Sequence, residues 1–120
     1  MPFPHNRSYA TKVVGESHYE GNLRELCGQA EATMRQYVTT AILTLENDNP
    51  YDCNAVRVDI RGLTVGHLSR ADAVIFRRRC GSPNRAQFEC DAVIVSLHGE
   101  AVCDYGVRLE LPDLLRPITL

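Results

Sequence analysis

Hydrophobic and polar residues alternate most regularly in the middle of the chain, in the segment Ala55–Ile60. Every second residue there is aliphatic and faces one side, while charged residues lie between them. A period of two is typical of a β-strand with one buried face, because successive side chains of a strand point to opposite sides. Arg61–Gly62 then provides a turn, and Leu63–Leu68 is predicted to return as the second strand of a hairpin. Gly66 inside that strand indicates a bulge or a close backbone approach.

Four further segments have the composition or the alternation of strands. Residues 37–46 are rich in β-branched side chains, which favour extended backbone. One face of this strand would carry Tyr37, Thr39, Ala41, Leu43 and Leu45. The remaining predicted strands cover residues 12–15, 88–97 and 101–111.

Capping signals predict two short helices. Asn22 is a suitable N-cap with Glu25 three residues later, so residues 22–28 are expected to form one or two helical turns. Ser69–Asp72 has the S-x-x-D capping pattern ahead of residues 73–79. A second helix is therefore expected to begin at this serine.

About six strands and two short helices define a mainly β chain. Short strands at this spacing are typical of a small barrel of the oligonucleotide-binding (OB) type or of a small sandwich, and periodicity does not choose between the two. The 120-residue length suits one domain. We expect the domain to cover residues 9–112, with a flexible tail at 1–8 and a C-terminal tail at 113–120.

Composition narrows the function classes. The formal net charge is -2, which disfavours a long electropositive groove for duplex DNA but leaves room for a compact pocket with a few cations. The five cysteines include no C-x-x-C pair, which argues against a zinc site and fits a reducing cytoplasm. No segment has the apolar length of a membrane span, so we expect a cytoplasmic protein with no cofactor, no metal and no membrane partner.

One run of arginines stands out. Arg77, Arg78 and Arg79, with Arg85 nearby, could extend a DNA path along one side of the domain. The alternative is a solvated helix end whose charges complement the helix dipole, and this interpretation is favoured.

The segment Asp48–Val56 places an aromatic residue, a carboxylate and two amides on a proline-stiffened turn that leads into a strand. Taken alone, Asn49, Asp52 and Asn54 are expected only to cap the turn. Two more segments add to this one, Val13–Tyr19 and Val65–Arg70.

With these three segments together, the chain resembles the HIRAN domain family, in its stand-alone bacterial form. The resemblance runs from about Thr11 to Leu111 and depends mainly on Asn-Pro-Tyr-Asp-x-Asn-Ala-Val at 49–56 and on Val-Gly-His-Leu at 65–68. It implies an OB-like barrel that holds the 3′ end of single-stranded DNA.

The resemblance also implies roles for individual residues. Asp52 would accept a hydrogen bond from the terminal 3′-hydroxyl and repel a terminal phosphate. Tyr51 and Tyr19 would pack against the last bases or sugars, where stacking tolerates any sequence. Asn49 would orient Asp52 or contact the DNA backbone.

Cationic and imidazole side chains would contact phosphate. By resemblance this role falls to Arg70, and His67 beside it would add a donor. Where helicase-linked members carry a basic residue and two aromatic residues after the first glycine, this chain has Ser17, His18 and Tyr19. His18 would still contact DNA, but one phosphate contact and one stacking ring are missing, which predicts a lower affinity or a different preferred end.

The expected function is therefore recognition of a single-stranded DNA 3′ end in DNA repair or replication-fork processing, with a helicase or nuclease as the candidate partner enzyme. The acidic residues are scattered and no phosphate-cradling glycine loop occurs, so an enzyme is not expected. The alternative is a protein-interaction adaptor that captures a peptide without binding DNA.

Overall fold

The computed structural model describes residues 9–27, 36–80, 86–98, 103–111 and 116–117. In chain order the elements are β1 (Thr11–Val14), the 3₁₀ helix η1 (Glu16–Tyr19), α1 (Glu20–Cys27), β2 (Gln36–Glu46), β3 (Ala55–Ile60), β4 (Leu63–Leu68), α2 (Arg70–Cys80), β5 (Gln87–His98), β6 (Cys103–Glu110) and β7 (Arg116–Pro117).

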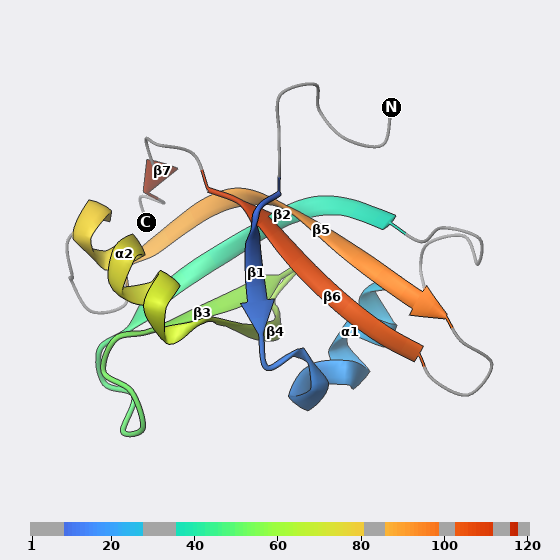
Figure 1. Cartoon of the computed structure of the whole chain (residues 1–120), viewed down its shortest axis with the longest axis horizontal. Helices are drawn as coiled ribbons and strands as arrows, with labels where there is room; N and C mark the ends of the chain where they lie inside the picture. Colours follow the sequence, from blue (N-terminus) through green and yellow to red (C-terminus); the bar gives the residue numbers. More distant parts are fainter. Residues whose placement is uncertain (1–8, 28–35, 81–85, 99–102, 112–115, 118–120) are drawn as a thin grey trace.

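Six antiparallel strands close into a barrel (Figure 1). The strand order is β2-β3-β4-β1-β6-β5, and β2 pairs with β5 to close the ring. The prediction of a small OB-like barrel with two short α-helices is confirmed, and the sandwich alternative is wrong. Closure leaves no free edge among these six strands.

The hairpin of β3 and β4 has the bounds that the alternation predicts. Its two-residue turn is Arg61–Gly62, and both residues have positive φ, at 50° and 79°. This is the backbone that a tight hairpin requires, because its twist matches that of the flanking strands. Gly62 is suited to it because it has no Cβ.

The register of β3 against β4 shifts between Val58 and Asp59, next to Gly66. A Cβ placed on Gly66 would lie 2.5 Å from Val13 Cγ1 and 2.5 Å from the Val14 carbonyl oxygen. The predicted bulge and close approach are therefore both present. This position lets β1 lie directly against β4.

The barrel interior is aliphatic, and the two α-helices lie on different sides of the barrel (Figure 1). α1 buries Leu23 and Leu26. α2 buries Phe76, whose ring meets that of Phe88 edge-on with centroids 5.4 Å apart. The predicted start of α2 at Ser69 is confirmed, since Ser69 Oγ accepts a hydrogen bond from the Asp72 backbone N–H at 3.1 Å. The predicted N-cap at Asn22 is wrong, because α1 begins at Glu20 and the Asn22 side chain donates to the Thr64 carbonyl at 2.8 Å.

The chain ends are only partly described. The predicted tail at 1–8 lies outside the described residues, as does Arg85. Within the segment 113–120, expected to be a tail, Arg116 and Pro117 pair with β5. No helix in the described ranges is long and apolar enough to cross a membrane.

Candidate nucleic-acid interface

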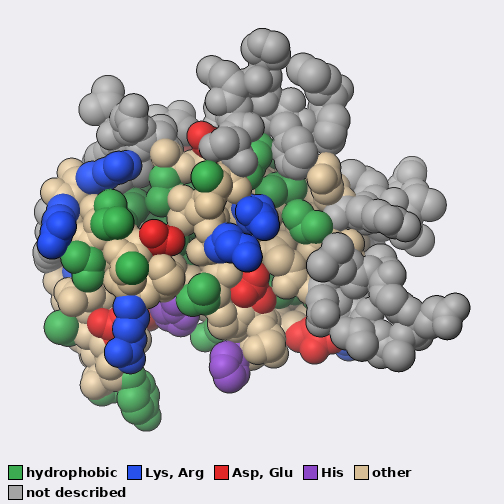
Figure 2. Space-filling model, viewed as in Figure 1, with side chains coloured by type: hydrophobic (Ala, Val, Ile, Leu, Met, Phe, Trp, Pro, Cys, Tyr) green, Lys and Arg blue, Asp and Glu red, His purple; other side chains and the backbone are tan. Residues whose placement is uncertain are grey.

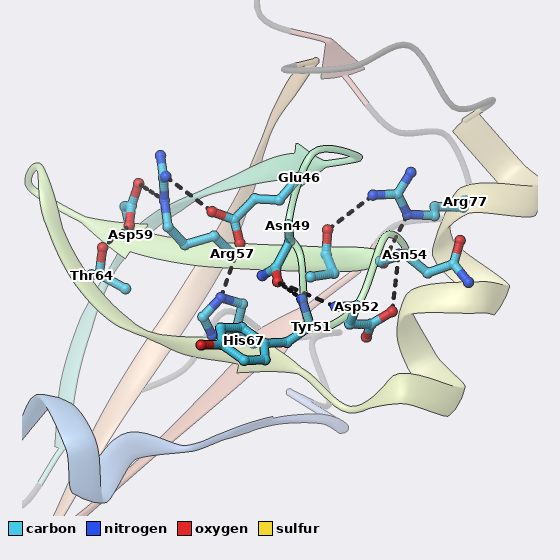
Figure 3. A network of polar contacts seen from close by, with 11 residues as sticks. Glu46, Asn49, Tyr51, Asp52, Asn54, Arg57, Asp59, Thr64, His67 and Arg77 are labelled. Carbon is cyan, nitrogen blue, oxygen red and sulfur yellow. Dashed lines mark hydrogen bonds and ion pairs between the residues drawn. The ribbon is translucent and has the colours of Figure 1, made fainter.

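The loop of residues 47–54 joins β2 to β3 and is held by its own polar side chains (Figure 3). Asn49 Oδ1 accepts hydrogen bonds from the backbone N–H groups of Tyr51 at 2.9 Å and Asp52 at 3.2 Å. Asp52 Oδ1 accepts from the Asn54 N–H at 2.9 Å. The turn-capping expectation is thus correct for Asn49 and Asp52, and the loop conformation is fixed before any ligand arrives.

Tyr51 and one carboxylate oxygen of Asp52 remain available after this capping. Tyr51 is 90% exposed, so its ring faces solvent at the tip. The second carboxylate oxygen of Asp52 has no hydrogen-bond partner among the described residues. An exposed aromatic ring directly precedes a carboxylate that has one unused acceptor.

A buried arginine supports this loop from α2. Arg77 is 6% exposed and donates from Nε to the Asn54 carbonyl at 2.8 Å and from Nη2 to the Ala55 carbonyl at 2.9 Å. Its Nη1 donates to Asn47 Oδ1. The expectation of a solvated helix end is therefore wrong for Arg77, although Arg78 and Arg79 are exposed.

Sequence reasoning missed this role, yet a signal was present. Arg77 lies four residues after Ala73 and one after Phe76, which are both buried. Helical periodicity puts all three on one face. A charged residue on a buried face needs partners, and the carbonyls of the loop supply them.

A chain of ion pairs and hydrogen bonds crosses the outside of β2, β3 and β4 (Figure 3). One carboxylate oxygen of Glu46 lies 3.0 Å from His67 Nε2, and the other accepts a hydrogen bond from Arg57 Nη1 at 3.3 Å. Arg57 Nε reaches Asp59 Oδ2 at 3.0 Å, and Asp59 Oδ1 accepts from Thr64 Oγ1 at 2.8 Å. Glu46, which the sequence did not single out, ties the root of the loop to β4.

The candidate residues from the other segments are only partly brought together. The rings of Tyr19 and His67 lie with centroids 6.4 Å apart, so η1 borders the end of β4. Arg70 is exposed at the start of α2, three residues after His67. His18 is exposed, and no described contact joins it to the other candidates.

Positive charge is dispersed around this site. On the face in Figure 2, Lys and Arg side chains adjoin each other only near the middle, and the others stand apart from them. In the described ranges, no group of three or more His, Cys, Asp or Glu side chains could hold a metal ion. The arrangement therefore suits contacts to a short segment of a polar, anionic ligand through an aromatic ring, one carboxylate and single cations.

Comparison with known proteins adds nothing to this geometry, since no family model, curated protein or solved structure matches the chain. The class defined by fold and site is a small OB-like barrel with a preformed polar loop.

The cysteines of this site and of the core should differ in reactivity. Burial raises the pKa of the Cys90 thiol to about 12, so almost no thiolate is present between pH 7 and 9. Cys53, next to Asp52, is exposed. With iodoacetamide and peptide mass spectrometry, we expect Cys53 to be alkylated in the native protein and Cys90 only after unfolding. Equal labelling of both in the native protein would contradict the burial of β5.

Proposed function

We propose that this protein is a binding module of the HIRAN type that holds the 3′-hydroxyl end of single-stranded DNA. The observation that carries the proposal is the pairing of a fully displayed Tyr51 ring with the unused carboxylate oxygen of Asp52 on a loop fixed by Asn49 and Arg77. Preorganisation favours binding because little loop entropy is lost when the ligand arrives.

Each group then has a definite task. The Tyr51 ring stacks on the terminal base, a contact that is sequence-tolerant and contributes about 1–3 kcal/mol. Asp52 accepts the hydrogen bond of the terminal hydroxyl and repels a terminal phosphate. Arg70, which is exposed at the start of α2, and His67 would contact the adjoining phosphates. The expected setting is DNA repair or replication-fork processing, in which a helicase or nuclease would act on the held end.

The test is fluorescence anisotropy with short strands that end in a 3′-hydroxyl or a 3′-phosphate. Asp52→Asn keeps an oxygen for the Asn54 cap but removes the charge, so we expect the preference for the hydroxyl end, about tenfold or more in wild type, to disappear. Asp48→Asn removes the same charge from the same loop and should leave the preference intact. If both variants change the preference equally, Asp52 acts only through its negative charge and not through a hydrogen bond to the terminal hydroxyl.

A second candidate function is a protein-interaction adaptor. The observation that favours it is the exposure of Val74 and Ile75, at 37% and 48%, on neighbouring positions of α2. A peptide partner would depend on these side chains rather than on Tyr51 and Asp52, and its affinity would change little with salt. Failure of both DNA ends to bind at low salt would favour this function.

A further inference from the structure

Two cations lie directly opposite each other on the outside of the barrel. Lys12 of β1 and Arg108 of β6 are register partners, and both are exposed. Like charges at directly opposed positions of an antiparallel pair destabilise a sheet. Neither side chain has an ion-pair or hydrogen-bond partner among the residues that the structure describes. The pair therefore has a cost to stability that a bound anion would offset.

The cation pair borders a groove of about 260 Å³. Its other lining residues are Glu16, Val95, Gly106 and Val107. Glu16 already has a hydrogen-bond partner within the protein, because its Oε2 accepts a hydrogen bond from the Val107 backbone N–H at 3.2 Å. Gly106 has no side chain, and a Cβ there would meet nothing within 4 Å, so the groove is open beside Arg108. Two cations against one hydrogen-bonded carboxylate leave a site that attracts anions.

This groove and the 47–54 loop are linked by one continuous sheet face. Lys12 and Val14 are two residues apart on β1, so they point to the same side. Val14 is the register partner of His67, and His67 is the partner of Arg57. Figure 2 shows Lys and Arg side chains gathered near the middle of the face, where β1 and β6 lie side by side in Figure 1. The outward side chains thus lead across the barrel from β3 to β6.

The length of this face fits a short stretch of nucleic acid. β4 and β1 separate β3 from β6, and three strand spacings span ~14 Å. A stacked strand advances about 3.4 Å per nucleotide. A strand whose end is held at the 47–54 loop would therefore bring a phosphate to the cation pair after roughly four nucleotides.

We propose that Lys12 and Arg108 form a second anchor that holds an internal phosphate of the strand whose 3′ end is bound at Tyr51 and Asp52. This inference depends on the proposed function and adds to it a direction for the bound strand, outward over β4 and β1 to β6. The module would then bind the 3′ end together with the nucleotides that precede it.

The test compares the double variant Lys12→Gln/Arg108→Gln with wild type, using two-nucleotide and eight-nucleotide strands with a free 3′-hydroxyl. The two-nucleotide strand cannot reach the cation pair, so its affinity should not change. The eight-nucleotide strand should bind about tenfold more weakly. The slope of log affinity against log salt concentration should be shallower by about 1. The double variant should also be at least as stable as wild type to urea, because the like-charge contact is gone.

The matched control is Arg78→Gln/Arg79→Gln, which removes the same charge from exposed positions on α2. It should leave both strands bound as in wild type. If the control weakens the eight-nucleotide strand and the Lys12/Arg108 variant does not, the strand runs along α2 and the inference is overturned. In that case an Asp52-dependent preference for the hydroxyl end would still support the proposed function. If wild type shows no such preference with either strand length, the proposed function itself is overturned.

Discussion

Replacing Arg77 with methionine is expected to lower the free energy of unfolding by about 3 kcal/mol. Methionine keeps an unbranched apolar stem in the buried space but donates no hydrogen bond. The carbonyls of Asn54 and Ala55 and the amide oxygen of Asn47 would lose the donor that they share. Carbonyls that are partly or fully buried, as those of Asn54 and Ala55 are, become costly without a partner, because they lose water without gaining a replacement.

Urea unfolding followed by circular dichroism measures this change. Arg78→Met is the matched control, since the same substitution one residue later falls on an exposed position and should stay within about 0.5 kcal/mol. Arg77→Lys should lie between the two, because a single ammonium cannot reproduce the fork of a guanidinium over three oxygens. Coincident unfolding curves for Arg77→Met and Arg78→Met would contradict the buried clamp.

The same variant separates loop support from DNA contact. Arg77 is buried beneath the loop, so in the proposed function it would position the loop and would not contact DNA itself. We expect Arg77→Met, at a temperature where it remains folded, to weaken binding of the 3′-hydroxyl strand while leaving the salt slope unchanged. A shallower slope would mean that Arg77 itself meets a phosphate.

Local structure could be predicted from adjacent residues, whereas periodicity alone could not decide between a barrel and a sandwich. The alternation in Ala55–Ile60 and the turn at Arg61–Gly62 are properties of adjacent residues, and the hairpin has those bounds. Closure instead depends on β2, where Leu43 pairs with Val58 on one side and with Phe88 on the other. Strands of a barrel and of a sandwich have the same period of two, so only these distant pairings decide between them.

The candidate site divides in the same way. Capping by Asn49 and Asp52 acts over two or three residues and could be predicted from turn chemistry. The support by Arg77 and the link from Glu46 to His67 join residues that are more than twenty positions apart. Helical periodicity groups Ala73, Phe76 and Arg77 on one face of α2, but only the fold shows that the 47–54 loop covers this face and that β4 lies within reach of Glu46.

Gly66→Ala is the second substitution that we expect to lower the free energy of unfolding strongly. The added Cβ would meet Val13 Cγ1 and the Val14 carbonyl oxygen at 2.5 Å, well inside van der Waals contact. Val13 is a buried core residue and the oxygen belongs to the backbone, so neither moves without displacing β1. The φ of 155° adds strain for any residue with a Cβ. We expect Gly66→Ala to cost about 3 kcal/mol or more of folding free energy.

Gly106→Ala is the matched control, a glycine in β6, on the far side of β1 from β4, where a Cβ meets nothing within 4 Å. It should be neutral or slightly stabilising, since alanine loses less backbone entropy on folding. The damage from Gly66→Ala should appear first between β1 and β4, because Val13 pairs with Leu68 and Val14 with His67 there. Hydrogen exchange should then speed up at the β1 amides before it does so in β2 and β5, and His67 should lose its fixed place beside Tyr19 and Glu46. Uniformly faster exchange across the barrel would mean that β1 and β4 do not separate as a local unit, and that the close approach at Gly66 is only one contact among many in a fully cooperative fold.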